Sequence, residues 1–262
     1  MTTKAKRNTN AQDESIIVTC MDRRITGALS EDISKRPELK EIFGNHPILV
    51  RNAGGSIEGA KGTIKKLLDT GKFATLGVVV HTDCGAMGVV YSVCKGEREC
   101  EQNEINALEI AEFKKFNFNA VSELCRLNEE LQKSKAENIF GANKKITVKA
   151  ALLDVDRLNV PKGDGTKYLV ITKPGSPSKY SKIFKGAEER WFSYVIQADD
   201  IEEMMPSIHI AVKDIGVQGI RLIATTSNES SELSEWADKI RQSKIAKGLP
   251  IVTVLRSGTK AA

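Results

Sequence analysis

Three short apolar runs in the first third of the chain, SIIVTC (residues 15–20), HPILVRN (46–52) and TLGVVVHTDC (75–84), decide the fold. The longer stretches between them, residues 27–43 and 56–71, carry apolar side chains at helical spacing. This alternation predicts a βαβαβ unit. Because the third run is apolar at nearly every position, helices are expected to cover both faces of a parallel sheet. The sequence therefore predicts an α/β fold with a central, mostly parallel β-sheet flanked by helices.

The rest of the chain continues the same pattern. Residues 86–141 are predicted to form one or two long helices, and strands within residues 144–158 and 167–172 are expected to extend the sheet at its edge. The segment KPGSPSKYSK (173–182) concentrates Pro, Gly and Ser, which is typical of a linker. Alternating helix and strand patterns follow up to residue 256 and predict an additional C-terminal α/β segment.

These patterns divide the chain into three parts. We expect a disordered N-terminal tail (1–14), a main α/β domain (15–178) and a C-terminal α/β extension of unknown role (179–262). Residues 207–227 faintly echo residues 56–83, but the His and Cys that follow the first copy have no counterpart after the second. We interpret the two segments as unrelated βαβ units rather than as a repeat.

Charge and cysteine content narrow the class of protein. The 39 Lys and Arg residues against 34 Asp and Glu give a net charge of +5, but the basic residues are scattered, so no nucleic-acid partner is expected. The polar N-terminus has no signal-peptide pattern, and no apolar run has the length of a membrane span, so no membrane association is expected. The five cysteines lack the spacing of a disulfide scaffold, which favours a reducing, cytoplasmic location.

Three motifs follow predicted strands, where open α/β sheets place their ligand sites. They are C-M-D-R-R (20–24), R-N-A-G-G (51–55) and H-T-D-C-G (81–85). His81 and Cys84 are close enough in sequence to bind one ion from a single turn, and the neighbouring strand could add Cys20. One imidazole and two thiolates suit zinc, and three protein ligands leave a fourth position for water, as in catalytic sites. Spacing alone leaves open the alternative of buried structural cysteines and a core histidine.

In their order and separations, C-M-D-x-R, R-N-A-G-G and H-T-D-C-G resemble the motifs of the β-class carbonic anhydrases, in particular the short-chain branch of that class. The segment KAALLDVDRLNV (149–160) also resembles a late strand of the class. The resemblance covers roughly residues 15 to 160 and implies that residues 15–178 form a β-carbonic-anhydrase-like zinc domain.

Carried over residue by residue, the resemblance implies a complete catalytic site. Cys20, His81 and Cys84 would hold Zn²⁺, and Asp22 and Arg24 would form a catalytic hydrogen-bonded pair beside it. Asp22 would orient a zinc-bound hydroxide, and Arg24 would keep this carboxylate off the metal. If the pair opened, Asp22 would become a fourth ligand. For these two charges the alternative is an ordinary ion pair on a surface loop.

The glycines of the second motif have two compatible roles. Gly54 and Gly55 satisfy the backbone of a strand-to-helix turn, and they would also let the backbone approach a bound substrate such as bicarbonate.

The implied activity is that of a carbonate dehydratase, a zinc lyase. Zinc-bound hydroxide would hydrate carbon dioxide reversibly to bicarbonate and a proton, in a homodimer or a higher homo-oligomer. Two alternatives stay open: a hydrolase of carbon disulfide or carbonyl sulfide on the same scaffold, and a catalytically silent zinc-binding regulatory protein. The C-terminal segment departs from the short-chain branch. His46 and His209 lie outside the motifs, so no proton-transfer residue is identified.

Overall fold

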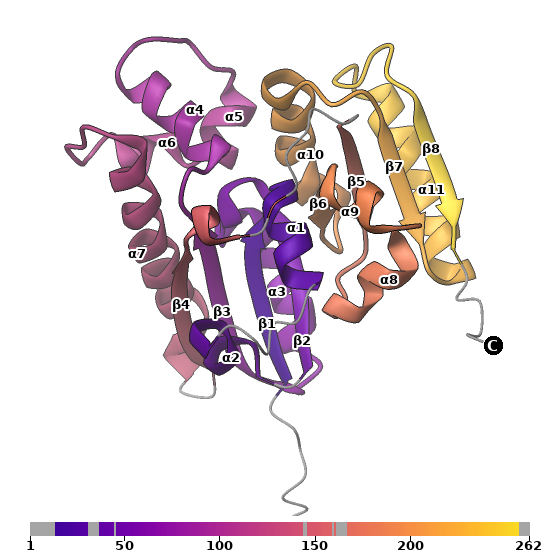
Figure 1. Ribbon diagram of the computed structural model, residues 1–262, viewed down its shortest axis with the longest axis horizontal. Helices are drawn as coiled ribbons and strands as arrows, with labels where there is room; N and C mark the ends of the chain where they lie inside the picture. Colours follow the sequence, from indigo (N-terminus) through magenta and orange to yellow (C-terminus); the bar gives the residue numbers. More distant parts are fainter. Residues whose placement is uncertain are drawn as a thin grey trace, which may run out of the picture.

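The computed structural model describes residues 14–30, 37–44, 46–143, 146–158, 160 and 167–256. Within these ranges, eight strands form one sheet (Figure 1). The strands are β1 (Glu14–Cys20), β2 (His46–Asn52), β3 (Phe73–His81), β4 (Thr147–Leu153), β5 (Tyr168–Thr172), β6 (Ser193–Gln197), β7 (Ile220–Ala224) and β8 (Ile251–Leu255). Of the predicted disordered tail (1–14), only Glu14, the first residue of β1, is among the described residues.

Helices connect these strands. They are α1 (Arg23–Ser30), α2 (Pro37–Phe43), α3 (Lys61–Leu68), α4 (Gly85–Cys94), α5 (Gln102–Ala107), α6 (Ile110–Phe113), α7 (Val121–Phe140), α8 (Tyr180–Ile183), α9 (Ala187–Trp191), α10 (Ile201–Ile210) and α11 (Ser227–Gln242). The long helical region predicted for residues 86–141 is thus one long helix, α7, preceded by three shorter ones. Among the described helices, none combines the length and the apolar character that a membrane span requires.

The strand order confirms the predicted fold class. The order is β4-β3-β1-β2-β6-β5-β7-β8, and every neighbouring pair is parallel except β2 and β6. The strand predicted within residues 144–158 lies at the sheet edge as expected, but the edge position expected for residues 167–172 is wrong. This strand, β5, lies between β6 and β7. Its last four residues are buried, as in a strand that is covered on both faces and paired on both sides.

The sheet consists of two halves with the same internal order. Outward from the β2–β6 junction, one half runs β2-β1-β3-β4 and the other β6-β5-β7-β8. In each half the second strand in the chain lies at the junction, followed by the first, third and fourth. Backbone hydrogen bonds across the junction repeat this relation: Val195 N donates to Met21 O, after β1, and Leu49 N donates to Gly175 O, after β5. The halves are therefore related by an approximate two-fold axis at the junction.

The faint sequence echo coincides with this symmetry. Residues 56–83 contain α3 and β3, and residues 207–227 contain the end of α10 and β7, which hold the equivalent positions in the second half. This placement argues against interpreting the two segments as unrelated units. The three-part division of the chain stays a prediction, although the second set of strands begins with β5, before the boundary expected near residue 178.

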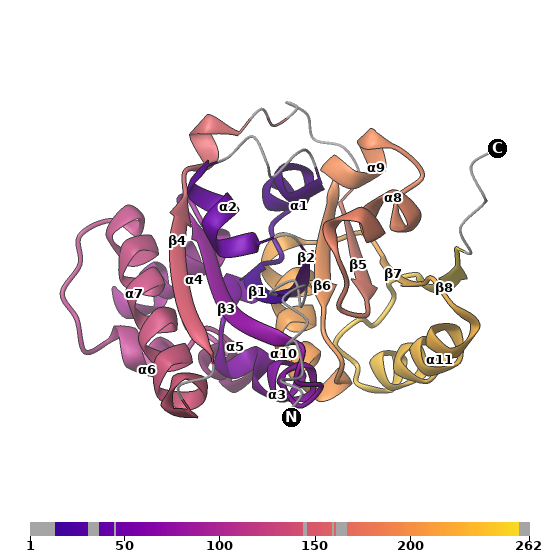
Figure 2. The same ribbon diagram turned by 90° about the horizontal axis from the view of Figure 1, so that it is seen from below.

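Side chains alternate between two layers of helices. Helices α1, α2, α8 and α9 cover one face of the sheet, and α3, α7, α10 and α11 cover the other (Figure 2). On β1, Ile17 belongs to the core cluster of the first layer, whereas Ile16 and Val18 belong to a cluster on the opposite face. On β5, Val170 and Ile171 divide in the same way. The two-residue period of the strands thus builds a core on each face of the sheet.

A buried arginine fixes the junction between the halves. Arg51, on β2, is fully buried and pairs with Gln197 of β6 at the antiparallel step. Its guanidinium donates to Cys20 O at 3.0 and 2.8 Å and to Asp22 O at 2.9 Å. It also donates to the Tyr180 hydroxyl at 2.9 Å, and that hydroxyl donates to Gln197 Oε1 at 3.1 Å. One side chain therefore ties the end of β1 to the second half.

Replacing this arginine should destabilise the protein strongly. Arg51→Met leaves carbonyl and hydroxyl groups without their donor, and each buried polar group without a partner costs about 1–3 kcal/mol, so we expect a loss of at least about 3 kcal/mol. Urea unfolding measures it. Arg157→Met, at a side chain that is 83% exposed, is the control and should change stability by less than about 0.5 kcal/mol. Equal effects of the two variants would contradict a structural role for Arg51.

Candidate metal centre

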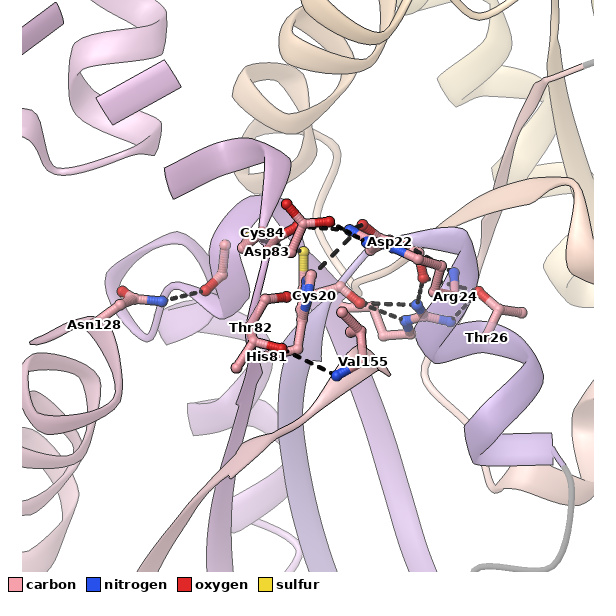
Figure 3. Close-up of polar contacts among 12 residues, drawn as sticks. Cys20, Asp22, Arg24, Thr26, His81, Thr82, Asp83, Cys84, Asn128 and Val155 are labelled. Atoms are coloured by element: carbon pink, nitrogen blue, oxygen red, sulfur yellow. Dashed lines mark hydrogen bonds and ion pairs between the residues drawn. The ribbon is translucent and has the colours of Figure 1, made fainter. Parts of the chain in front are cut away.

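The three predicted metal ligands meet at the carboxyl edge of the first half of the sheet. Cys20 is the last residue of β1, His81 is the last residue of the neighbouring β3, and Cys84 lies at the N-terminal cap of α4. All three are buried, the Cys20 and Cys84 Sγ atoms are 3.9 Å apart, and the candidate ligand atoms lie within 4.8 Å of one another (Figure 3). Among the described residues, no other group of this kind meets the same criterion.

The geometry of these side chains fits a metal ion. His81 Nδ1 lies 2.8 Å from Thr82 O, so its proton points at that carbonyl and the lone pair of Nε2 is left free. Nε2 is buried and has no hydrogen-bond partner. Zinc bonds of about 2.0–2.3 Å in a tetrahedron separate ligand atoms by roughly 3.5 Å, which small side-chain adjustments reach from here. A buried, unpaired nitrogen facing two thiols is the donor set of a soft divalent metal.

The two cysteines differ in proton affinity. The hydrogen bond with Cys84 and the nearby His81 lower the pKa of Cys20 well below that of a free thiol. The same hydrogen bond, together with burial, raises the pKa of Cys84 well above it. Because the pKa of Cys84 is raised, metal binding must displace the proton of this thiol.

Asp22 and Arg24 form the predicted pair beside this cluster. Arg24 Nε donates to Asp22 Oδ1 at 3.1 Å, and Nη2 donates to Oδ2 at 2.8 Å. Burial alone would raise the pKa of Asp22, but the hydrogen bonds from Arg24 and the nearby His81 hold it below its ordinary value. Asp22 Oδ2 lies 4.0 Å from His81 Nε2. A side chain with 9% exposure does not fit the alternative of an ordinary surface ion pair, and Asp22 is an ionised acceptor at the edge of the cluster.

Asp83 holds Arg24 in place. Arg24 Nη1 donates to the Asp83 carboxylate and Nη2 to the Asp83 carbonyl oxygen, both at 2.6 Å. Asp83 adopts a left-handed conformation with φ 49°, which aspartate tolerates better than most residues. Because Asp83 lies between the two ligands of H-T-D-C-G, the loop that supplies His81 and Cys84 also fixes the arginine.

The two predicted glycines shape the backbone next to the cluster. Gly54 and Gly55 lie in the turn Ala53–Gly55 with φ values of 69° and 70°, so side chains there would be strained. A Cβ atom on Gly55 would lie 3.4 Å from the backbone of Thr19. Asn128 Nδ2 donates to Gly54 O at 2.9 Å (Figure 3). Their substrate-binding role stays a prediction, since Ala53 rather than either glycine lines the adjacent pocket.

A pocket of about 380 Å³ opens beside the cluster, and both halves of the sheet line it. The first half contributes a charged side and an apolar side, and the second half closes the pocket with a tyrosine, two isoleucines and an aspartate. The lining residues are Cys20, Met21, Asp22, Arg23, Arg24, Ala53, Asp83, Gly85, Ala86, Val89, Tyr194, Ile210, Asp214 and Ile215. We call this cavity the metal pocket.

The residues from the second half were not predicted from the sequence. Tyr194 lies on β6, Ile210 ends α10, and Asp214 and Ile215 lie in the π-helical turn Ala211–Ile215 that follows it. They reach the metal pocket because β6 runs antiparallel to β2, which brings this end of the second half over the carboxyl ends of β1 and β3. No local pattern encodes that junction. Isolated π-helical turns are frequent at functional sites, but only the structure reveals this one.

Comparisons with known proteins add little to this geometry. No family model and no curated protein matches the sequence. Among solved structures, the chain is similar to a carbonic anhydrase from Glaciozyma antarctica, with 18% sequence identity and a TM-score of 0.31, over 55% of this chain and 77% of that one. A likeness at this TM-score supports neither fold nor function, and both rest on the geometry above.

Metal content tests the cluster directly. We expect the protein to bind about one zinc per chain and Cys84→Ser to lose most of it, because a hydroxyl is a much poorer zinc ligand than a thiolate. Elemental analysis after dialysis against zinc gives the stoichiometry. Cys94→Ser, at a partly buried cysteine outside the cluster, is the matched control and should retain the metal. Equal zinc content in the two variants would exclude Cys84 as a ligand.

Proposed function

We propose that the protein catalyses the reversible hydration of carbon dioxide to bicarbonate and a proton, with zinc held by Cys20, His81 and Cys84. One observation carries the proposal: an ionised carboxylate, Asp22, lies at the edge of the three-ligand cluster and lines the pocket beside it. A closed structural zinc site has four protein ligands and needs no such acceptor, whereas three protein ligands are typical of a catalytic site.

Zinc held by these three residues would lower the pKa of a bound water towards about 7 and would so supply a nucleophile near neutral pH. Two thiolate ligands neutralise the charge of the metal and weaken this effect, so the surrounding residues must orient the nucleophile.

Asp22 is placed for that task. Asp22 is an ionised acceptor in the wall of the metal pocket, so it could accept a hydrogen bond from a hydroxyl group there and would thereby orient that group towards the substrate. Arg24 binds both carboxylate oxygens of Asp22, and this keeps the carboxylate from becoming a fourth ligand. Arg24 is fixed in turn by Asp83. The three side chains thus hold the acceptor in one orientation before substrate arrives.

The apolar side of the metal pocket suits carbon dioxide. The side chains of Val89, Ile210 and Ile215 are hydrocarbon and form no hydrogen bonds. Carbon dioxide is a small molecule without a hydrogen-bond donor, so contact with these side chains leaves no donor of the substrate unpaired. Such a wall favours a small apolar molecule over water close to the nucleophile. Gly54 and Gly55 would place their backbone near the bicarbonate product. A homo-oligomeric assembly and a cytoplasmic location stay predictions.

Stopped-flow carbon dioxide hydration, on protein of known zinc content, tests the proposal. Asp22→Ala should leave zinc bound and lower kcat/KM by about 10- to 100-fold, the usual effect of removing a group that orients a metal-site partner. Asp238→Ala, at an exposed aspartate outside the pocket, should leave both zinc and activity unchanged.

Two outcomes would contradict the proposal. Full activity in zinc-free protein would exclude the mechanism. Stoichiometric zinc without hydration would exclude the substrate, and assays with carbon disulfide and carbonyl sulfide would then separate a related hydrolase from a catalytically silent zinc protein.

A further inference from the structure

A second cavity adjoins the metal pocket, and one residue lines both. This cavity has a volume of about 350 Å³ and is lined by Arg98, Glu99, Cys100, Glu101, Glu104, Lys213 and Asp214. Asp214 also lines the metal pocket. A titratable side chain therefore lies in the wall between the candidate metal centre and an open cavity on the other side.

Asp214 is half of a carboxyl pair. Arg98 Nη1 donates to Asp214 Oδ1, and Arg98 Nη2 donates to both Glu104 oxygens at 3.0 and 2.9 Å, so one guanidinium holds the two acids together. Asp214 Oδ2 is buried without a hydrogen-bond partner. Burial and the neighbouring Glu104 raise the pKa of Asp214. The pKa of Glu104 is lowered despite burial, by the Glu101 backbone and Arg98. Of the two acids, Asp214 is therefore the one whose pKa is raised.

His209 continues the series towards the surface. Its ring is buried and neither nitrogen has a hydrogen-bond partner. Nε2 lies 3.8 Å from Glu104 Oε1 and 3.3 Å from Glu101 Oε2. The Glu101 side chain is 60% exposed, so the series Asp214, Glu104, His209, Glu101 begins in the metal pocket and ends in solvent. The longer of these gaps exceeds a hydrogen bond, and a side-chain rotation or one bridging water closes it.

The proposed hydration releases a proton in the metal pocket. Each hydration breaks an O–H bond of a water in the metal pocket, and its proton must leave before the next turnover. Two other carboxylates, Asp22 and Asp83, line the metal pocket, and Arg24 binds both oxygens of Asp22 and one oxygen of Asp83. Asp214 differs from both, because its pKa is raised and because it lines the second cavity as well as the metal pocket.

We propose that Asp214 accepts the proton released in the metal pocket and that Glu104, His209 and Glu101 pass it to solvent, an inference that rests on the proposed function. The proton moves from a water oxygen in the metal pocket to the Asp214 carboxylate, and each later acceptor donates to the next, so no electrons are transferred. The charged and titratable groups that share the two cavities with Asp214 are Arg98, Glu99, Cys100, Glu101, Glu104 and Lys213, with His209 beside Glu104, on one side, and Cys20, Asp22, Arg23, Arg24, Asp83 and Tyr194 on the metal-pocket side.

Steady-state kinetics separate proton transfer from a structural role. Asp214→Asn and His209→Gln should lower kcat by about 100-fold, the usual contribution of a positioned proton-transfer group, while kcat/KM for carbon dioxide stays unchanged. A high concentration of imidazole buffer should restore kcat, because a small molecule then carries the proton. Glu101→Gln changes the solvent-exposed end of the series, where a substitution is least able to disturb folding. It should lower kcat less than Asp214→Asn and His209→Gln do. Asp199→Asn, at an aspartate paired with Lys173 and absent from both cavities, is the matched control.

A measurement without metal tests the same groups. In zinc-free protein, NMR of ¹³C-labelled aspartate carboxyls should give Asp214 a titration midpoint above that of an ordinary aspartate, and His209→Gln should shift this midpoint. The proton route would be overturned if kcat and kcat/KM of these variants fell together, or if imidazole did not restore kcat. It would also be overturned if the titration midpoint of Asp214 were unchanged in His209→Gln. Wild-type protein with this titration but no hydration would instead refute the proposed function.

Discussion

The buried guanidinium of Arg51 is the interaction on which the rest of the structure depends. Burying a cation is costly unless hydrogen bonds replace its hydration. Here they go to the carbonyls of Cys20 and Asp22, to the Thr26 hydroxyl and to the Tyr180 hydroxyl. Cys20 and Asp22 are therefore fixed through their backbone by the same group that joins the halves of the sheet. The candidate metal centre and the junction are parts of one hydrogen-bonded unit.

The two-fold relation of the halves explains what the C-terminal segment does. In the first half, β1 ends at Cys20 and β3 ends at His81. In the second half, the equivalent strand β5 ends at Thr172 and β7 ends at Ala224. The second half thus repeats the strand order without the metal donors. Its contribution is steric and electrostatic, since Tyr194, Ile210 and Asp214 close the pocket over the ligands of the first half. Residues from both halves of one chain therefore line the metal pocket.

The sequence predicted those features that follow from local rules. Cys20, His81 and Cys84 could be predicted to meet because parallel strands bring their carboxyl ends to one edge, and the structure brings them together. The position of β5 could not be predicted, because local pattern identifies a strand but not its neighbours. Asp214 was missed for the same reason. It reaches the metal pocket through an antiparallel junction whose register is a single residue pair, Arg51 and Gln197. Arg51 begins the second motif, but nothing in the sequence marks Gln197 as its partner.

Environment gives two aspartates in one pocket opposite properties. Both are partly shielded from solvent, and burial alone would raise the pKa of each. Asp22 has an arginine on both of its oxygens, which lowers its pKa, whereas Asp214 shares its arginine with a second carboxylate, and its pKa rises. The proposed hydration needs an acceptor that stays ionised beside the nucleophile and a separate group that can take up a proton. One pocket can provide both roles when the pKa values of two titratable groups in it are shifted in opposite directions. In this proposal the first half of the sheet provides Asp22 and the second half provides Asp214.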